Sequence, residues 1–456
     1  QYRVFQARYR GKTTCPDCGG SRLRREALAV HVGDRNLAEV LELSVRDAKR
    51  WFDALELSAH ETKVGERLLQ ELRHRLDILE RVGLHYLTLN RPANTLSGGE
   101  SQRIHLATSL SAALVGSMYI LDEPSVGLHP RDADQLLGVL QALRDAGNTV
   151  IVVEHDDVFM RAADTVIDIG PGAGRLGGEV VYAGPGSGLA LAPTLTGDYL
   201  SGRKQVGRTA LGTEARHWIE LRGARAQNLK DVTVRIPLER LTAVCGVSGS
   251  GKTTLVRNIL VPALQKLLGE YGGRAGAFDE LTGDWRRISA VEVVDQNPMG
   301  KSSRSNPVTY LKAYDDIRNL YAAQKSAQLR GYAAKHFSFN TDGGRCPVCQ
   351  GDGYVTVEMQ FMADVHLKCE QCHGKRFMAD VLEVEFQGKS ISDILELTVD
   401  EAMEFFAAHQ QKKITDKLRP LADVGLGYIQ LGQSSSTLSG GEAQRVKLAS
   451  FLVRGH

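Results

Sequence analysis

The sequence predicts an α/β fold made of two related modules, each with a helical subdomain, and a small cysteine-rich module inserted in the second. Three observations support this prediction. The sequence "TLSGGESQRIHLATSL" at Thr95–Leu110 returns as "TLSGGEAQRVKLASFL" at Thr437–Leu452. Short apolar stretches that end in polar residues lie between amphipathic segments, which is typical of sheets covered by helices. Two Cys-x-x-Cys pairs stand between a glycine-rich loop and the second copy of the repeat.

The repeat extends beyond these two segments. "LELSVRDAKRWF" at Leu41–Phe52 corresponds to "LELTVDEAMEFF" at Leu395–Phe406, and "RVGLHYLTL" at Arg81–Leu89 corresponds to "DVGLGYIQL" at Asp423–Leu431. The first pair is offset by 354 positions and the second by 342, so the first copy carries twelve extra residues in the helix between them. Such long-range self-similarity indicates a duplicated module.

The duplication sets the expected domain boundaries. We predict that residues 1–205 are the back part of one module and that residues 206–456 are the front and middle of a second. A glycine-rich stretch and the polar segment Ser201–Arg216 would link them. Because the chain begins with Gln1 and ends just after a helix-like segment, we expect it to be part of a longer protein.

The composition is that of an ordinary water-soluble chain. Hydrophobic residues make up 42% and charged residues 24%, with a formal net charge of +2. We find no apolar run of membrane-spanning length and no signal-peptide pattern, so we expect no membrane association and a cytoplasmic location. Closely spaced cysteine pairs in such a chain indicate metal binding more than disulfides.

A phosphate-binding loop is predicted at "GVSGSGKT", Gly246–Thr253. The preceding "LTAVC" (241–245) has the pattern of a buried strand, and residues 253–268 have the pattern of the following helix. In this context glycines let backbone N–H groups wrap a phosphate, Lys252 reaches the β- and γ-phosphate oxygens, and Thr253 can ligate Mg²⁺. The predicted ATP contacts here are Gly246, Ser248, Gly249, Ser250, Gly251, Lys252, Thr253 and Thr254.

Two acids follow another predicted strand, in "SMYILDEPSVGLH" (Ser117–His129). Asp122 suits Mg²⁺ binding through water, and Glu123 suits polarising an attacking water molecule. "TVIVVEHD" (Thr149–Asp156) predicts a further buried strand that would carry His155 to a γ-phosphate. A histidine at a strand end is often only structural, but the acid pair about thirty residues earlier favours the catalytic interpretation.

The repeated "LSGGE-QR" segments place a serine and two glycines just before a predicted helix. Exposed N–H groups and the helix dipole at such a start favour an anion. The alternative, an ordinary helix N-cap, does not explain why Gly-Gly-Glu follows in both copies. The predicted ATP contacts are Ser97, Gly98 and Gly99 in the first copy and Ser439, Gly440 and Gly441 in the second.

The cysteine pairs "CPVC" and "CEQC" have the spacing C-x₂-C-x₁₉-C-x₂-C. This spacing suits a closed, structural tetrahedral zinc site. The predicted ligands are Cys346, Cys349, Cys369 and Cys372. A further pair, "CPDC", contains Cys15 and Cys18.

Basic residues near the cysteines are candidates for contact with nucleic acid. The segment "VTVEMQFMADVHLKC" (Val355–Cys369) alternates like a hairpin, and its apolar residues could pack on a distorted duplex or simply form hairpin core. The basic stretch Lys301–Lys335 could face phosphates or form a solvated helix surface. The candidate DNA contacts are Lys301, Arg304, Lys368, Lys375 and Arg376.

Together the phosphate loop, "LSGGE-QR", "LDEPSVGLH" and the strand-terminal His155 resemble the ATP-binding cassette (ABC) ATPases. In that family the signature of one cassette closes over the phosphate loop of the other. The resemblance implies that the Ser97 signature completes the site built on Lys252. The Ser439 signature would complete a site with Asp122 and Glu123, whose phosphate loop lies upstream. The Walker B strand and histidine of the second cassette would follow His456, so hydrolysis by this segment alone should be feeble.

A narrower resemblance rests on "CPVCQGDG", "CHGKRF", "RSNPVTY" and "LDEPSVGLHPRD". These motifs are similar to those of the UvrA family of bacterial DNA-damage-recognition ATPases. The resemblance implies a homodimer that uses ATP, Mg²⁺ and Zn²⁺, recognises distorted double-stranded DNA and loads the partner UvrB. Gln296 would contact Mg²⁺ and the attacking water. Cys15 and Cys18 would be the second half of the first module's zinc site.

Three other functions stay open on the residues alone. A UvrA-like relative could give self-resistance to DNA-binding drugs. A transport-class cassette protein could energise a membrane partner, although the inserted cysteine module and the lack of a membrane segment argue against this. A module that uses nucleotide only as a switch would not need the acid Glu123.

Overall fold

A computed structural model describes residues 15–96, 98–111, 115–207, 214–270, 273–294, 305–357 and 365–454. The chain divides into two compact units, which are described separately. The first unit comprises residues up to 168 together with 182–291, and the second comprises 169–181 together with 292–456. This division follows compactness and so differs from the repeat-based boundary at residue 205, which stays a prediction. Among the described residues, every helix is too short or too polar to cross a lipid bilayer.

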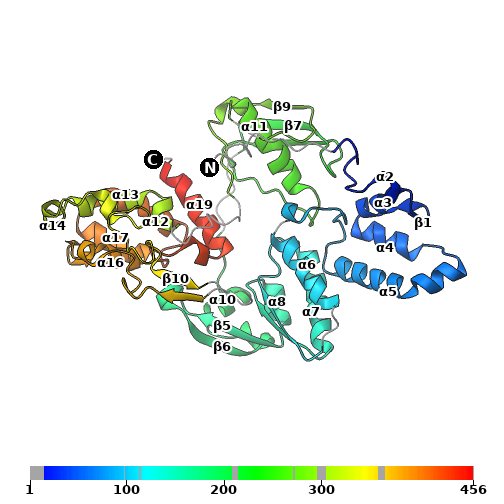
Figure 1. Ribbon diagram of the computed structural model, residues 1–456, viewed down its shortest axis with the longest axis horizontal. Helices are drawn as coiled ribbons and strands as arrows, with labels where there is room; N and C mark the ends of the chain where they lie inside the picture. The colour runs from blue at the N-terminus through cyan, green and yellow to red at the C-terminus, as the bar shows by residue number, and fades with distance from the viewer. Residues whose placement is uncertain are drawn as a thin grey trace. The chain divides into compact units, whose positions relative to one another are not determined.

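The first unit mixes short strands with helices (Figure 1). Strands β5 and β6 pair with each other where the division between the units falls. The elements up to that point are α2 (Arg25–Leu28), β1 (His31–Val32), β2 (Arg35–Asn36), α3 (Leu37–Glu42), α4 (Val45–Asp53), α5 (Ala59–Arg81), η1 (Ala93–Thr95), α6 (Gly98–Ser111), β3 (Met118–Asp122), α7 (Pro130–Asp145), β4 (Thr149–Val153), α8 (Asp157–Ala162), β5 (Thr165–Gly170) and β6 (Glu179–Pro185), while η2 (Gly174–Leu176), between β5 and β6, belongs to the second unit. The later elements of this unit are α9 (Gly186–Leu189), α10 (Leu195–Leu200), β7 (Trp218–Ala224), β8 (Val232–Pro237), η3 (Thr254–Leu260), α11 (Val261–Leu267), β9 (Glu280–Gly283) and η4 (Trp285–Arg287).

The parallel strands β3 and β4 carry the candidate catalytic residues, and their prediction as strands is confirmed. They pair in register from Met118 opposite Thr149 to Asp122 opposite Val153. Helix α7 buries Leu136 and Leu140 against the inward side chains of the pair. The outward side chains, such as Ile120 and Val153, are exposed. The expected full burial of β4 is therefore wrong on that face, because no described element of this unit packs against it.

The phosphate loop lies between an antiparallel sheet of order β8-β7-β9 and a helix. The helix predicted over 253–268 is confirmed; its first turns (η3) are π-helical and α11 continues it to Leu267. The prediction of a strand over residues 241–245 is wrong. These residues form no strand, and the Leu241 side chain is fully exposed. An isolated extended segment becomes a strand only when a neighbour supplies hydrogen bonds, and no described strand does so here.

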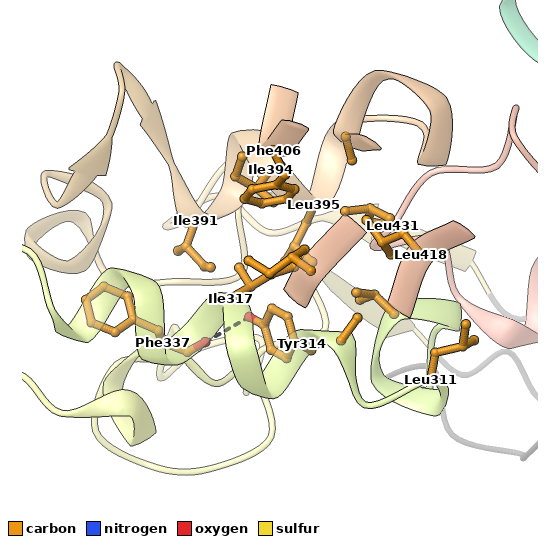
Figure 2. Packing of buried hydrophobic residues seen from close by; sticks show 14 of the residues in the cluster. Leu311, Tyr314, Ile317, Phe337, Ile391, Ile394, Leu395, Phe406, Leu418 and Leu431 are labelled. Carbon is orange, nitrogen blue, oxygen red and sulfur yellow. Dashed lines mark hydrogen bonds between the residues drawn. The ribbon is translucent and has the colours of Figure 1, made fainter. Parts of the chain in front are cut away.

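The second unit is mainly helical and contains one large core cluster (Figure 2). Phe406, Ile394 and Leu418 come from separate helices and Leu431 from a turn, and all four are fully buried in this cluster. The elements are α12 (Pro307–Tyr310), α13 (Ala313–Ala322), α14 (Lys325–Leu329), η5 (Ala334–Phe337), β10 (Tyr354–Val357), β11 (Val365–Lys368), α15 (Ala379–Leu382), β12 (Glu385–Phe386), β13 (Lys389–Ser390), α16 (Ile391–Glu396), α17 (Val399–Ala408), α18 (Lys412–Asp423), η6 (Ser435–Thr437) and α19 (Gly440–Arg454).

The two units repeat one helical motif. Helices α3, α4 and α5 of the first unit correspond to α16, α17 and α18 of the second, and each set begins with a two-stranded hairpin and a capping box. Helix α5 has 23 residues against 12 in α18, so most of the extra residues of the first copy lengthen this helix, as predicted. Figure 1 shows the long α5 as the most extended helix of its set.

Truncation of the Phe406 side chain should weaken the second unit. Phe406 is fully buried in the core cluster, so Phe406→Ala should lower the local free energy of unfolding by about 3–5 kcal/mol through lost burial and a cavity. Hydrogen exchange followed by mass spectrometry on peptides of residues 399–423 measures this. The control Leu329→Ala changes a side chain that is 88% exposed and should cost less than about 0.5 kcal/mol. Equal effects of the two substitutions would contradict this description of the core.

Candidate functional site

The loop 246–253 curves through three glycines with positive φ. Gly246, Gly249 and Gly251 have φ of 146°, 74° and 100°, values that side chains with a Cβ rarely adopt. The Lys252 ammonium donates hydrogen bonds to the carbonyl oxygens of Gly246 (2.6 Å) and Val247 (2.8 Å). The lysine therefore folds back along its own loop, and the Ser250 N–H donates to the Val247 carbonyl at 3.2 Å.

Three side chains from elsewhere in the first unit support this loop, and the sequence analysis missed all of them. Asn228 Nδ2 donates to the Gly249 carbonyl at 2.9 Å. Asp132 Oδ2 accepts from the Ser248 backbone N–H at 3.3 Å. The Tyr86 ring lies against Gly249, where an added Cβ would come within 2.5 Å of the ring. Local pattern gives no signal for contacts over such sequence distances; only the Gly249 spacing within the loop motif hints that something approaches the backbone closely.

The candidate catalytic acids stand at the carboxyl end of β3. Asp122 is the last strand residue, and Glu123 follows with a φ of 43°. The Glu123 N–H donates to the Val153 carbonyl at 2.8 Å, and Gln102 of α6 donates to the Asp122 carbonyl at 2.5 Å. Both acidic side chains are exposed. Their backbone is fixed by neighbouring elements while their carboxylates remain accessible, as a metal-binding or water-activating role requires.

Glu154 joins the ends of β3 and β4. Its carboxylate accepts from the Ser125 N–H at 2.8 Å and from the His155 N–H at 3.1 Å. Because β3 and β4 are parallel and in register, Glu123 and His155 leave neighbouring strands at the same edge. The structure thus brings the predicted acid pair and the predicted histidine to neighbouring strand ends, and the Glu154 carboxylate, which the sequence did not predict to have a role, links the two ends.

The glycines of the two "LSGGE" segments begin helices α6 and α19. Gly99 is packed closely, because an added Cβ would lie 2.6 Å from the Val126 carbonyl oxygen. At the second segment, Ser439 Oγ accepts from the Glu442 N–H at 3.2 Å and the Glu442 carboxylate accepts from the Ser439 N–H at 2.8 Å. These contacts are those of a capping box. Anion binding at either segment stays a prediction. Four predicted contacts, Ser97, Gln296, Lys301 and Arg304, lie outside the described residues.

The four predicted zinc ligands form a buried cluster in the second unit. Their sulfur atoms all lie within 4.8 Å of one another, with 3.8 Å between Cys346 and Cys369 and 3.6 Å between Cys349 and Cys372. A tetrahedral ion with bonds of about 2.3 Å to sulfur needs edges of about 3.8 Å. These distances are far too long for disulfides. The thiol set therefore fits one structural Zn²⁺ with no open coordination position.

The surroundings of the cluster affect its thiols in opposite ways. Hydrogen bonds from the Cys372 and Gln371 backbone lower the pKa of Cys369, whereas burial raises the pKa values of Cys349 and Cys372. Gly351, two residues after Cys349, has a φ of 89°. A Cβ added at Gly351 would lie 2.1 Å from the Phe339 carbonyl oxygen, so there is no room for a side chain. The tight chain path therefore needs glycine to bring the cysteines together.

The other cysteine pair is different. Cys15 is exposed and Cys18 is partly exposed, and hydrogen bonds from the backbone of Gly20 and Arg22 lower the pKa of Cys18. Within the part of the chain that the structure describes, only the four buried cysteines gather three or more potential metal ligands. Zinc binding by Cys15 and Cys18 stays a prediction.

A hairpin rises from the cysteine cluster. Strands β10 and β11 pair antiparallel from Tyr354 opposite Lys368 to Val357 opposite Val365, so the predicted hairpin is confirmed. The side chains on both faces are exposed, so of the two interpretations of its apolar residues the described strands do not support hairpin core. Lys368 and Lys375 are exposed, whereas the Arg376 guanidinium lies over the Phe339 ring at 5.6 Å.

A mixed α/β fold with a glycine-rich phosphate loop, an acid pair at a strand end and a helix-starting "LSGGE" defines an ABC-type ATPase fold. A profile described as "AAA domain, putative AbiEii toxin, Type IV TA system" matches residues 33–161. The crystal structure of UvrA2 from Deinococcus radiodurans is similar, with a TM-score of 0.88 and 42% identity over 99% of this chain and 57% of that chain.

The curated relatives narrow the class further. UvrABC system protein A of Staphylococcus epidermidis is 49% identical over 452 residues, and that of Listeria monocytogenes is 49% identical over 456 residues. Each match covers 99% of this chain and 48% or 47% of the relative. The chain is thus a UvrA homologue that spans about half the length of the curated relatives it matches.

The zinc fit can be tested by metal analysis. Cys349→Ser should remove about one zinc ion per chain, because a tetrahedral thiolate site does not survive the loss of one ligand intact. Zinc is measured by elemental mass spectrometry on purified protein. Cys245→Ser is the matched control, since Cys245 is exposed and lies outside the cluster; it should leave the zinc content unchanged. Unchanged zinc in Cys349→Ser would show that these thiols do not hold the ion.

Proposed function

We propose that this chain belongs to an ATP-dependent sensor of distorted double-stranded DNA that acts in nucleotide excision repair and loads UvrB. The observation that carries the proposal is a zinc-type cysteine cluster with an exposed hairpin in a chain homologous to UvrA. A nucleotide cycle would supply the energy, and the hairpin would sense the duplex. The protein would work as a homodimer with DNA and UvrB as its partners.

The surface of the hairpin supports DNA contact. Val355, Val357 and Leu367 are each at least 40% exposed, although such side chains normally find cover. Lys368 and Lys375 add positive charge beside them, which favours phosphates in a salt-dependent way. Apolar side chains can enter a duplex whose base stacking is weakened, since unstacking then costs less. Recognition of this kind depends on DNA deformability rather than on base sequence.

The ATP chemistry is assigned to residues of this chain as follows. In the site built on Lys252, the lysine and backbone N–H groups of the loop would hold the phosphates, and Thr253 with Gln296 would hold Mg²⁺, which neutralises charge on the phosphates. In the site completed by the Ser439 signature, Asp122 would bind Mg²⁺ through water. Glu123 would orient and polarise the attacking water. His155 would donate to the γ-phosphate from the neighbouring strand end. Closed zinc coordination by the four cysteines would serve structure alone.

We further propose that the sites are composite and that the repeat serves this purpose. The Ser97 signature would face the loop of Lys252, and the Ser439 signature would face the site of Asp122 and Glu123. Each module would then contribute a different half to each site. This arrangement supports the modules predicted at residues 1–205 and 206–456 as functional units.

A pair of substitutions should separate nucleotide binding from turnover in the protein at its natural length. Lys252→Ala should raise the Kd for ATP by about tenfold or more, because a charge-assisted contact to phosphate is lost. Glu123→Gln should lower the hydrolysis rate by about half or more, because one of two sites loses its base, while the Kd stays the same. Binding is followed with a fluorescent ATP analogue and turnover by phosphate release.

The matched control for the first substitution is Lys266→Ala, an exposed lysine on α11, which should leave both quantities unchanged. Turnover that persists in Glu123→Gln would argue for a protein that uses nucleotide only as a switch. An unchanged Kd in Lys252→Ala would overturn the assignment of the phosphate loop.

The hairpin should control discrimination between damaged and intact DNA. At one stated salt concentration and with ATP, the full protein should bind a lesion-bearing duplex more tightly than an intact duplex of the same sequence. Leu367→Ser should reduce this preference by about fivefold, since an exposed apolar contact to the unstacked site is lost. ATP hydrolysis should not change. Fluorescence anisotropy measures both affinities.

Leu329→Ser provides the control, because Leu329 is also exposed but lies on α14. No preference for the lesion in the unaltered protein would contradict the repair function. Equal binding of lesion and intact DNA, combined with tight binding to duplexes carrying an intercalated drug, would favour the self-resistance alternative.

A further inference from the structure

The phosphate loop touches two side chains that come from the segment before the first "LSGGE" and from helix α7. Both are more than 100 positions away in the sequence but lie in the same unit. Tyr86 supports the loop at Gly249, and Asp132 holds it at Ser248. Tyr86 lies in the repeated segment "RVGLHYLTL" and Asp132 is the last residue of "LDEPSVGLHPRD", but neither is among the residues predicted to contact ATP, Mg²⁺ or water.

Asp132 is placed unusually for an acidic residue. It is 1% exposed and sits in the first turn of α7, where the helix dipole favours negative charge. One carboxylate oxygen accepts from the Ser248 N–H at 3.3 Å, and the other lies 3.4 Å from the Arg131 guanidinium. Burial would raise the pKa of Asp132, but hydrogen bonding from Ser248 and the charge of Arg131 outweigh it, and the pKa lies below its ordinary value. The group is a buried carboxylate that holds a backbone N–H of the loop.

Tyr86 is held in turn by the signature helix. Its hydroxyl donates to Glu100 Oε1 at 2.7 Å, and Glu100 is 8% exposed. Glu100 follows Gly98 and Gly99 at the start of α6, so a change in the position of this helix is transmitted to the Tyr86 ring. The ring meets Gly249, which has a φ of 74° and no space for a side chain. The contact is close enough that loop and ring must move together.

The second copy repeats the tyrosine–glutamate pair in a different setting. Tyr428 donates to Glu442 at 2.6 Å, and an added Cβ on Gly174 would lie 3.1 Å from Tyr428. The pair is thus a feature of both helical subdomains. In each case the tyrosine lies against a glycine of another segment. Of the two tyrosines, Tyr86 is the one that contacts the phosphate loop in the described structure.

We infer that Tyr86, fixed by Glu100, and Asp132 are positioning residues that seat the 246–253 loop and thereby set its affinity for nucleotide. The inference rests on the proposed function of that loop in ATP binding. Asp132 accepts from the Ser248 N–H, and the Val247 carbonyl accepts from the Ser250 N–H at 3.2 Å, so the path of the loop is fixed on both sides of Gly249. Helix α7, which carries Asp132, follows the loop that begins at Glu123. The contact between Asp132 and Ser248 therefore also connects the phosphate loop to the acid pair.

The test measures ATP affinity in the full protein, counting only the binding that Lys252→Ala removes. Asp132→Asn retains an acceptor oxygen but loses the charge, and it should weaken that binding by about three- to tenfold; Asp132→Ala should weaken it more. Tyr86→Phe keeps the ring but loses the hydrogen bond to Glu100 and should weaken it by about two- to fivefold. Asp132→Glu should restore part of the affinity lost in Asp132→Ala.

Asp134→Asn is the matched control, since Asp134 is exposed on the same helix two residues further on. Its affinity should equal that of the unaltered protein. The melting temperature without nucleotide is recorded for every variant. An unchanged melting temperature, together with the expected order of ATP affinities, would support the positioning role of Tyr86 and Asp132.

Two results would overturn the inference. The first is an unchanged Kd in both Asp132→Asn and Tyr86→Phe. The second is a lower melting temperature with an unchanged Kd, which would make the two residues purely structural. If Lys252→Ala does not change ATP binding by the protein, the proposed function of the phosphate loop is wrong. If Lys252→Ala weakens ATP binding but the Asp132 and Tyr86 variants do not, only the inference about these two residues is wrong.

Discussion

The parallel hydrogen-bond ladder between β3 and β4 is the constraint on which the first unit depends. It sets Asp122 opposite Val153, and this register brings Glu123 and His155 to one edge. The Glu154 carboxylate then ties the loop after β3 to the end of β4. Helix α7 packs its buried leucines on the inner face of the ladder and so fixes the position of its first turn. Asp132 in that turn reaches the phosphate loop, so a slip of one residue between the strands would disturb every part of the candidate site.

In the second unit, the hairpin of β10 and β11 needs support from outside its own two strands. A two-stranded hairpin has too little core to be stable alone, and β10 and β11 expose both faces. The cysteine cluster at their base supplies the missing rigidity. The Cys369 N–H donates to the Gly353 carbonyl at 3.0 Å, so a backbone hydrogen bond joins the two Cys-x-x-Cys segments at the base of the hairpin. The hairpin can thus present apolar side chains to a partner without burying them in the protein itself.

Much of this organisation could be predicted because it is written in local patterns. The glycine spacing of the phosphate loop, the Cys-x-x-Cys pairs and the repeated "LSGGE" each specify a short backbone path. The described structure has the strands β3 and β4, the helix after the phosphate loop, the helices α6 and α19 and the cysteine cluster where the sequence predicted them. The expected strand at 241–245 failed because strand formation depends on a neighbour, not on apolar residues alone. The expected burial of β4 failed for the same reason on its outer face.

The roles of the supporting residues could not be predicted, although Tyr86 lies in the repeat "RVGLHYLTL" and Asp132 in the motif "LDEPSVGLHPRD". A motif or repeat marks the segment but not the partner, and an acid in the first turn of a helix or a partly buried tyrosine can serve its own element alone. Their contact with residues 248 and 249 depends on how distant segments pack. Glu154 shares this property, since its two acceptor contacts are made to backbone N–H groups on separate loops. Sequence motifs identify the groups that perform chemistry more readily than the groups that hold them in place.

We propose that the signature of one copy faces the phosphate loop of the other, and a nucleotide-dependent cross-link tests this arrangement most directly. Cysteines would replace Gly98 and Ser250 in the full protein, and a short bis-maleimide would join them, with the linked peptides identified by mass spectrometry. We expect a 98–250 link within one chain that increases when ATP is bound, and no comparable link when the cysteine is placed at Gly440 in place of Gly98. A dominant 440–250 link, or a 98–250 link that nucleotide leaves unchanged, would contradict it.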